Sequence, residues 1–220
     1  MNFNTGVFEK TGYGSLSERA FYLAMGICLI YGLGGTAYVA NLTAIANYQP
    51  DLGAILILGL AIPIVGVIIA VKSKEPILSF IGYNMVLIPF GIILGPVLNH
   101  YSPNVIAKTF GLTCCITGIM TVLAVSHPTW FENLGTSLFF ALTGLVIARV
   151  AQIFFPILQH LTIIDWIAAG IFSLYIGYDM HRATRIPRTL DNAVDISLDL
   201  YLDILNLFLT LLRLSGDSDD

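Results

Sequence analysis

Long stretches without a single charged side chain are the feature that most restricts how this chain can fold. Four stretches, of 31, 20, 32 and 23 residues, contain no Asp, Glu, Lys or Arg. They are residues 20–50, 52–71, 76–107 and 109–131. A helix needs about 20 mostly apolar residues to cross the hydrocarbon core of a bilayer. Each stretch therefore predicts a membrane-spanning helix, and the solvent for most of this chain is predicted to be lipid.

The overall composition excludes several other classes of protein. Charged residues make up 11% of the chain and hydrophobic types 56%, whereas a soluble domain typically carries about 25% charged residues. A disordered chain needs low hydrophobicity and high charge, which is the reverse of this composition. Ten basic residues against fourteen acidic ones give no excess of positive charge that would indicate a nucleic-acid partner.

The charge spacing predicts seven spans in total. They are expected near residues 20–42, 52–71, 77–98, 106–126, 134–156, 163–180 and 197–214. The last span contains Asp199, Asp203 and Arg213, so it must be shielded from lipid by the other helices. We therefore predict an all-α polytopic membrane protein with seven transmembrane helices and the last helix central. A cytoplasmic segment 1–19 would precede the transmembrane domain 20–215, and an acidic tail 216–220 would follow it.

The distribution of Lys and Arg predicts the orientation, because cytoplasmic loops carry an excess of these residues. With the N-terminus inside, seven Lys or Arg residues fall on the inner side and two on the outer side. The seven are Lys10, Arg19, Lys72, Lys74, Arg182, Arg185 and Arg188. A cytoplasmic N-terminus is thus predicted, with the tail outside unless the last segment is re-entrant. The absence of a leader-like start suggests the inner membrane of a bacterium.

Ionisable side chains inside a membrane are costly and indicate function, and here they gather near the C-terminus. Asp179 ends the sixth span and Asp203 lies about two turns into the seventh. Two carboxylates brought close together cannot both ionise cheaply, so such a pair can share a proton. It could also offer oxygen ligands to Ca²⁺. The alternative is that each Asp only caps a helix or pairs with a nearby Lys or Arg.

Two further features leave alternatives open. Asp191, Asp195, Asp199 and Asp203 recur every four residues and would share one helix face. The first two suit a solvated helix start, while Asp191, Asp195 and Asp199 together could form a funnel that draws cations to the mouth of a pore. Arg149 lies within the fifth span, where its side chain is expected to snorkel to the headgroups or, as an alternative, to pair with a carboxylate across the bundle.

The C-terminal sequence resembles the Bax inhibitor family, also called the transmembrane Bax inhibitor motif family. The motifs are Ile171-Phe172-Ser173-Leu174-Tyr175-Ile176-Gly177-Tyr178-Asp179, Leu200-Tyr201-Leu202-Asp203-Ile204-Leu205-Asn206-Leu207-Phe208 and Leu211-Leu212-Arg213-Leu214, with Gly91 to Leu98 similar to the third-helix pattern. The resemblance covers roughly residues 20–215. It implies seven helices around a central last one. Because some bacterial members are described as pH-sensitive calcium leak channels, it also implies Asp179 and Asp203 as the gating pair.

The resemblance also implies a basic residue after the second helix that bridges to the first aspartate. Lys72 and Lys74 are the positions available for this latch, although a lysine lacks the bidentate fork of an arginine. Some members carry a glutamate within the second helix, and this chain has none between Asp51 and Lys72. A cation relay through a third carboxylate is therefore not expected.

Two functions from different classes follow. The first is a pH-sensitive cation channel or transporter, with calcium and protons as the conducted or sensed ions. The second is a regulator without transport that binds another membrane protein, such as a membrane AAA protease or a cell-death factor, through segment 1–19. No P-loop, dinucleotide fingerprint or nucleophile elbow occurs, so we expect no enzymatic activity and no resident cofactor.

Overall fold

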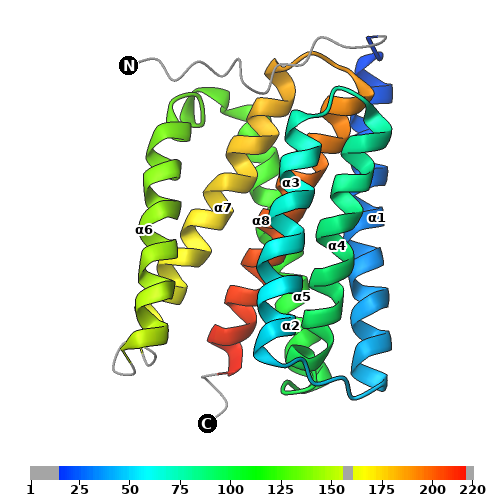
Figure 1. The fold of residues 1–220 in the computed structure, drawn as a ribbon. Helices are drawn as coiled ribbons and strands as arrows, with labels where there is room; N and C mark the ends of the chain where they lie inside the picture. The colour runs from blue at the N-terminus through cyan, green and yellow to red at the C-terminus, as the bar shows by residue number, and fades with distance from the viewer. Residues whose placement is uncertain (1–14, 156–160, 217–220) are drawn as a thin grey trace. The chain divides into compact units, whose positions relative to one another are not determined.

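The computed structural model of the chain describes residues 15–155 and 161–216 and is helical in this part, without a strand (Figure 1). The all-α prediction is confirmed. The helices are α1 (Glu18–Ile45), α2 (Leu52–Leu56), η2 (Ile57–Ala61), α3 (Ile62–Lys72), α4 (Pro76–Leu98), α5 (Pro103–Ser126), η3 (Pro128–Trp130), α6 (Leu134–Phe154), α7 (Thr162–Arg185) and α8 (Leu190–Gly216). Most of the predicted segment 1–19, and the tail after Gly216, lie outside the described residues.

Six of the predicted spans are present as helices long and apolar enough to cross a membrane. The second, Leu52–Lys72, joins α2, η2 and α3. Its π-helical turn at Ile57–Ala61 precedes Pro63, whose ring nitrogen has no hydrogen to donate to the preceding turn, which favours such a local widening. With α8 the described helices account for the seven predicted ones, and the chain is an integral membrane protein.

The last helix is longer than the charge spacing predicted. It begins at Leu190 and not near residue 197, because Thr189 caps it: the Asn192 backbone N–H donates to the Thr189 hydroxyl at 3.1 Å. Asp191 and Asp195 therefore belong to the helix. Most residues between Asp191 and Leu212 are buried, as expected for a central last helix. Its 27 residues extend about 40 Å at 1.5 Å per residue, without an internal break.

The helices form two compact units, and α8 contributes to both. Unit 1 comprises residues 1–102 and 186–201, and unit 2 comprises residues 103–185 and 202–220. In unit 1, α4 packs against both α1 and α3. In unit 2, α7 packs against both α5 and α6. Each unit is thus held together by contacts among its own helices.

Unit 1 holds its part of α8 through polar contacts to α1 and α4. The hydroxyls of Thr36 and Tyr201 hydrogen-bond at 2.7 Å, and the Tyr201 ring meets the Tyr83 ring edge-on with centroids 5.4 Å apart. Ser197 donates its hydroxyl to the Met25 carbonyl oxygen at 2.9 Å. A buried hydroxyl needs a hydrogen-bond partner. These contacts give the hydroxyls of Ser197 and Tyr201 such partners, so the polar first half of α8 can be buried in unit 1.

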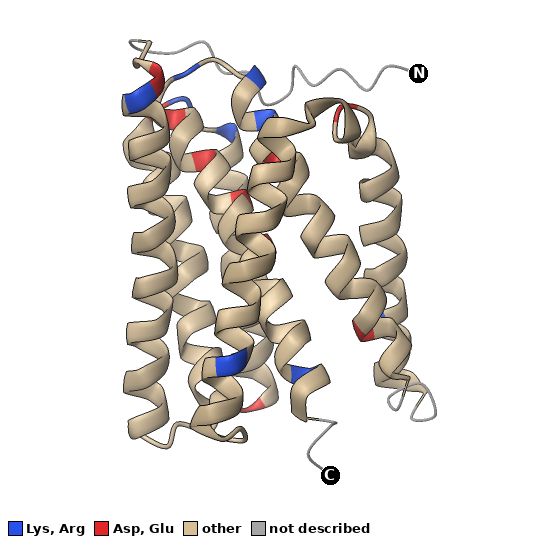
Figure 2. Cartoon of the chain, turned by 180° about the vertical axis from the view of Figure 1, so that it is seen from behind, with Lys and Arg blue, Asp and Glu red and all other residues tan. Residues whose placement is uncertain are grey.

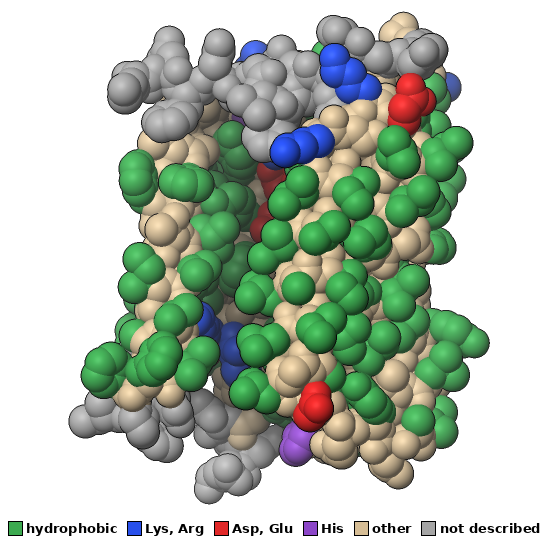
Figure 3. Space-filling view, viewed as in Figure 1, with side chains coloured by type: hydrophobic (Ala, Val, Ile, Leu, Met, Phe, Trp, Pro, Cys, Tyr) green, Lys and Arg blue, Asp and Glu red, His purple; other side chains and the backbone are tan. Residues whose placement is uncertain are grey.

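The surface of each unit suits a lipid environment. Hydrophobic side chains cover most of the helix flanks visible in Figure 3, and Ile30, Ile77 and Ile153 are each more than 70% exposed. Charged residues gather toward the helix ends (Figure 2). In unit 1 the start of α1 lies beside the loop before α8, because Arg188 pairs with Glu18 at 3.3 Å.

Candidate functional site

Asp179 lies near the C-terminal end of α7 and is 4% exposed. Arg182, three residues later on the same helix, donates from Nη1 to Asp179 Oδ1 at 3.0 Å. Both side chains are largely shielded, with 18% of the Arg182 side chain and 5% of the Asp179 side chain exposed. A charge that leaves water needs an opposite charge and hydrogen bonds, and Arg182 provides both within one helical turn.

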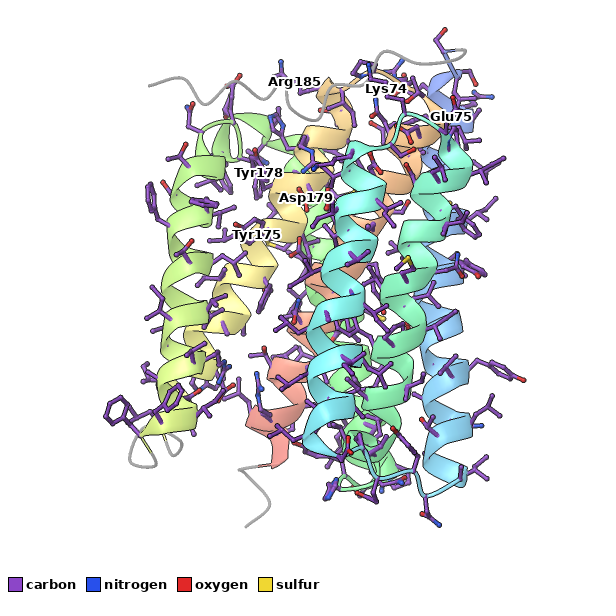
Figure 4. All side chains as sticks on the ribbon, viewed as in Figure 1. Lys74, Glu75, Tyr175, Tyr178, Asp179 and Arg185 are labelled. Carbon is purple, nitrogen blue, oxygen red and sulfur yellow. The ribbon has the colours of Figure 1, made fainter. Side chains whose placement is uncertain are left out.

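Tyr175 lies one turn before Asp179 on α7 (Figure 4), so the two side chains share a helix face. The carboxylates of Asp179 and Asp203 both act electrostatically on the Tyr175 hydroxyl. Asp203 comes from the part of α8 that belongs to unit 2 and is 9% exposed. The structure therefore places the two predicted acids in the same unit, both buried and both near enough to Tyr175 to act on it electrostatically.

Small residues of unit 2 set the position of this α7 face. A Cβ atom added at Gly135 of α6 would lie 2.5 Å from the Tyr178 hydroxyl oxygen, so the glycine leaves room for that side chain. A Cβ atom at Gly177 would likewise collide with the Phe131 ring. Tyr178 in turn interacts electrostatically with Arg182 and Asp179. These two close contacts between a glycine and an aromatic ring thus help to set the rotation of α7 about its axis, and with it the position of Asp179.

The predicted latch residues lie in the other unit. Lys72 ends α3 and Lys74 follows in the turn to α4 (Figure 4), and both side chains are exposed. A bridge from either lysine to Asp179 would join unit 1 to unit 2, and it stays a prediction. Within unit 2 the basic partner of Asp179 is Arg182, which sequence reasoning had counted only as a loop charge.

The acidic row at the start of α8 is less exposed than a solvated helix start would be. Asp191 is 3% exposed and accepts a hydrogen bond from the Ser79 hydroxyl of α4 at 2.5 Å. The interpretation of Asp191 as a solvated residue was wrong, because α4 packs over it. Asp195 and Asp199 are half-buried, and the role of the three as a cation funnel stays a prediction.

A second charged cluster lies at the opposite end of α7. Asp165 Oδ1 accepts from Arg149 Nη2 at 2.6 Å and from Arg213 Nε at 3.1 Å. Arg149 also donates to Gln152 at 3.0 Å. Arg149 thus pairs with a carboxylate on the neighbouring helix, which was the alternative expected from the sequence, and its snorkelling to the headgroups stays a prediction. Asp165 and Asp179 are 14 residues apart in one helix, or about 21 Å.

Among the residues described, no group of three or more His, Cys, Asp or Glu side chains could hold a metal ion. Two carboxylates and a phenol offer fewer oxygens than the six to eight that Ca²⁺ takes.

Sequence reasoning missed Tyr175 and Arg182 as site residues. The spacing held the signal, because both lie within one turn of Asp179 and side chains three or four residues apart are neighbours on a helix. Asp165 was also missed, because its partners Arg149 and Arg213 are 16 and 48 residues away.

Comparisons with known proteins give a family model and several bacterial relatives. A family model described as inhibitor of apoptosis-promoting Bax1 matches residues 18–220. An uncharacterized membrane protein of Vibrio cholerae is 28% identical over 84% of this chain and 85% of its own length. A protein of Borreliella burgdorferi is 28% identical over 78% of this chain and 76% of its own. A Helicobacter pylori protein is 30% identical over 58% of this chain, and the match spans 55% of that protein's length.

Proposed function

This chain belongs to the Bax inhibitor family, and on that premise we propose that it is a pH-sensitive calcium leak channel or transporter gated by Asp179 and Asp203. The observation that carries the proposal is the burial of both carboxylates in one unit, where both act electrostatically on Tyr175. A buried acid pair near a membrane face is costly and is kept where protons or cations pass. A protein that only bound a partner would not need it.

The chemistry of the pair supplies both the sensor and the cation contact. At higher pH both carboxylates are charged, so they repel one another and attract a divalent cation. At lower pH a shared proton removes that repulsion and one of the charges. Protonation thus changes the favoured packing of α7 against α8 and the affinity for calcium together.

Arg182 is expected to set the pH at which this change occurs. Its guanidinium favours the charged form of Asp179, so protonation of the pair needs a lower pH while Arg182 is present. In Arg182→Gln this ion pair is lost, and the midpoint of calcium flux against pH should rise. Flux into proteoliposomes loaded with a calcium dye measures that midpoint.

Arg185→Gln is the matched control for Arg182→Gln. Arg185 lies one turn later on α7 (Figure 4), but its side chain is 61% exposed and pairs with Glu132 at 3.6 Å. Solvent and salt screen such a charge, so its loss should leave the midpoint unchanged. An equal shift in the two variants would assign the effect to net charge and contradict the role of Arg182.

The proposed function is tested first on the unmodified chain. Calcium flux into dye-loaded proteoliposomes is measured from pH 5 to 8 and compared with protein-free liposomes. We expect flux above that background with a clear dependence on pH. No flux at any pH, with the protein shown to be helical and folded in the same vesicles, would overturn the proposal. The regulator that binds another membrane protein would then be the function to pursue.

A further inference from the structure

Asn206 is a polar side chain deep within α8 that the proposed gating does not use. It lies three residues after Asp203, in the part of α8 that belongs to unit 2, and it is half-buried. Ten residues of α8 follow it before the helix ends at Gly216, or about 15 Å of helix. That length is about half the thickness of the hydrocarbon core. An amide at this depth needs partners from the protein or its ligands, because lipid tails form no hydrogen bonds.

The polar side chains in the second half of α8 lie on one face of the helix. Between Asp203 and Arg213 the sequence is apolar except for Asn206 and Thr210. These four residues follow one another at intervals of three, four and three residues, which is the spacing of neighbours on a helix face. Thr210 is 1% exposed, so this face is buried in the protein there.

The two ends of this polar face both interact with α7. At one end the Asp203 carboxylate acts electrostatically on Tyr175, and at the other Arg213 donates to Asp165 at 3.1 Å. Tyr175 and Asp165 belong to α7, in the same unit. Asn206 lies between these two contacts along α8 and on the same side of the helix. It therefore belongs to the region where α8 faces α7, one turn from Asp203.

The amide of Asn206 is bonded at its nitrogen. Its Nδ2 donates to the Leu202 carbonyl oxygen, one turn earlier in α8, at 2.8 Å. This bond turns the side chain back toward the turn that carries Asp203, which is also the direction in which helical side chains lean. Among the residues that the structure describes, no donor bonds to the Asn206 carbonyl oxygen. The amide thus leaves one acceptor for a ligand.

Asn84 of α4 provides a direct comparison within the same chain. Its Nδ2 also donates to the carbonyl oxygen four residues earlier, that of Phe80, at 2.8 Å. Its own carbonyl oxygen, however, accepts from the Tyr31 hydroxyl at 2.7 Å. The same side-chain arrangement therefore occurs in unit 1 with the acceptor satisfied by the protein. At Asn206 the described part of the chain supplies no such donor.

We propose that the Asn206 carbonyl oxygen is a cation ligand next to Asp203 and favours Ca²⁺ over Mg²⁺. The proposal rests on the proposed function, in which the cation reaches Asp203. Ca²⁺ takes amide carbonyl oxygens together with carboxylates and water, whereas Mg²⁺ gives up its own water reluctantly. A neutral oxygen one turn from the acid therefore helps calcium more than magnesium. The acids set the pH response, and Asn206 sets the preference among divalent cations.

Asn206→Leu tests the proposal, because leucine has a similar size and no oxygen. Flux of calcium and of magnesium is measured separately in dye-loaded proteoliposomes from pH 5 to 8. We expect calcium flux to fall about tenfold, as for the loss of one bond to a charged group, and magnesium flux to fall less. The pH midpoint should stay, since Asp179 and Asp203 remain. The lost hydrogen bond lies within one helix, so the fold should persist.

Two further measurements keep the test independent of transport and of folding. Terbium(III), which takes the same oxygen ligands as calcium, is titrated onto the purified full chain and followed by its luminescence. Asn206→Leu should bind it about tenfold more weakly. In Asn206→Asp, either form of the new carboxyl group keeps an oxygen at this position, so calcium flux and terbium binding should persist.

Asn84→Leu is the matched control, because it removes the same intrahelical bond from a helix of unit 1. Its flux, its preference for calcium and its terbium binding should equal those of the unmodified chain. Unchanged flux and terbium binding in a folded Asn206→Leu, or equal losses in Asn84→Leu, would overturn the proposal. An absence of flux in the unmodified chain would overturn the proposed function instead, and terbium binding would still decide whether Asn206 is a cation ligand.

Discussion

Asp179→Asn and Asp203→Asn are each expected to abolish the pH response of calcium flux between pH 5 and 8. Either substitution leaves a single carboxylate of the pair, so the repulsion between the two acids and their ability to share a proton are lost. The side-chain volume hardly changes and the amide can still form hydrogen bonds, so the fold should persist. Flux of both variants is measured in dye-loaded proteoliposomes over the whole pH range.

The control for these substitutions is Asp51→Asn. Asp51 is exposed and caps α2, where its Oδ1 accepts from the Ala54 backbone N–H at 2.7 Å. Asn caps a helix about as well as Asp, so stability and pH response should be unchanged. A flux that keeps its midpoint in Asp179→Asn and in Asp203→Asn would show that another group senses protons, and Asp179 and Asp203 would then be structural.

The spans could be predicted closely because their signal is local. Charged residues are excluded from lipid-facing helices, so Asp51, Lys72 and Lys108 mark the loops or helix ends almost directly. The start of α8 was misplaced by about seven residues for the same reason. Asp191 and Asp195 looked like a boundary, but Ser79 and the packing of α4 against α8 make a buried position for Asp191. Such compensation comes from another helix and leaves no trace in the local pattern.

The partners of the charges were much harder to predict than the spans. Which side chain meets Asp165 depends on how α6, α7 and α8 are rotated about their own axes, and the sequence between them does not encode that rotation locally. Arg149 was placed correctly along its helix, yet its contact with Asp165 was only the alternative. Arg182 was within reach of prediction, because the pairing with Asp179 occurs inside one helix at a spacing of three residues.

Gly82→Ala is expected to destabilise unit 1 strongly, because it adds a methyl group where the backbones of α3 and α4 meet. The new Cβ atom would overlap the Gly66 carbonyl oxygen and lie 2.9 Å from the Ala70 backbone nitrogen. In the other direction, a Cβ atom at Gly66 would lie 2.6 Å from the Gly82 carbonyl oxygen. Small residues allow such close approach in lipid, where packing and not hydrophobic burial holds helices together.

The obstacle at Gly82 is backbone, which cannot rotate away as a flexible side chain can, so α3 and α4 must separate along their contact. Overpacking of this kind costs about 1–3 kcal/mol, and the rigid neighbours place Gly82→Ala at about 3 kcal/mol. Thermal unfolding in detergent micelles, or unfolding by added SDS, measures the loss.

Gly34→Ala is the matched control, because it adds the same methyl group to an exposed position of α1. Among the described residues, no heavy atom outside the local backbone lies within 4 Å of its new Cβ atom. This variant should be as stable as the unmodified chain or slightly more stable, since Ala is the better helix former. Equal stability of Gly34→Ala and Gly82→Ala would mean that α3 and α4 do not approach as closely as the Gly66–Gly82 contact requires.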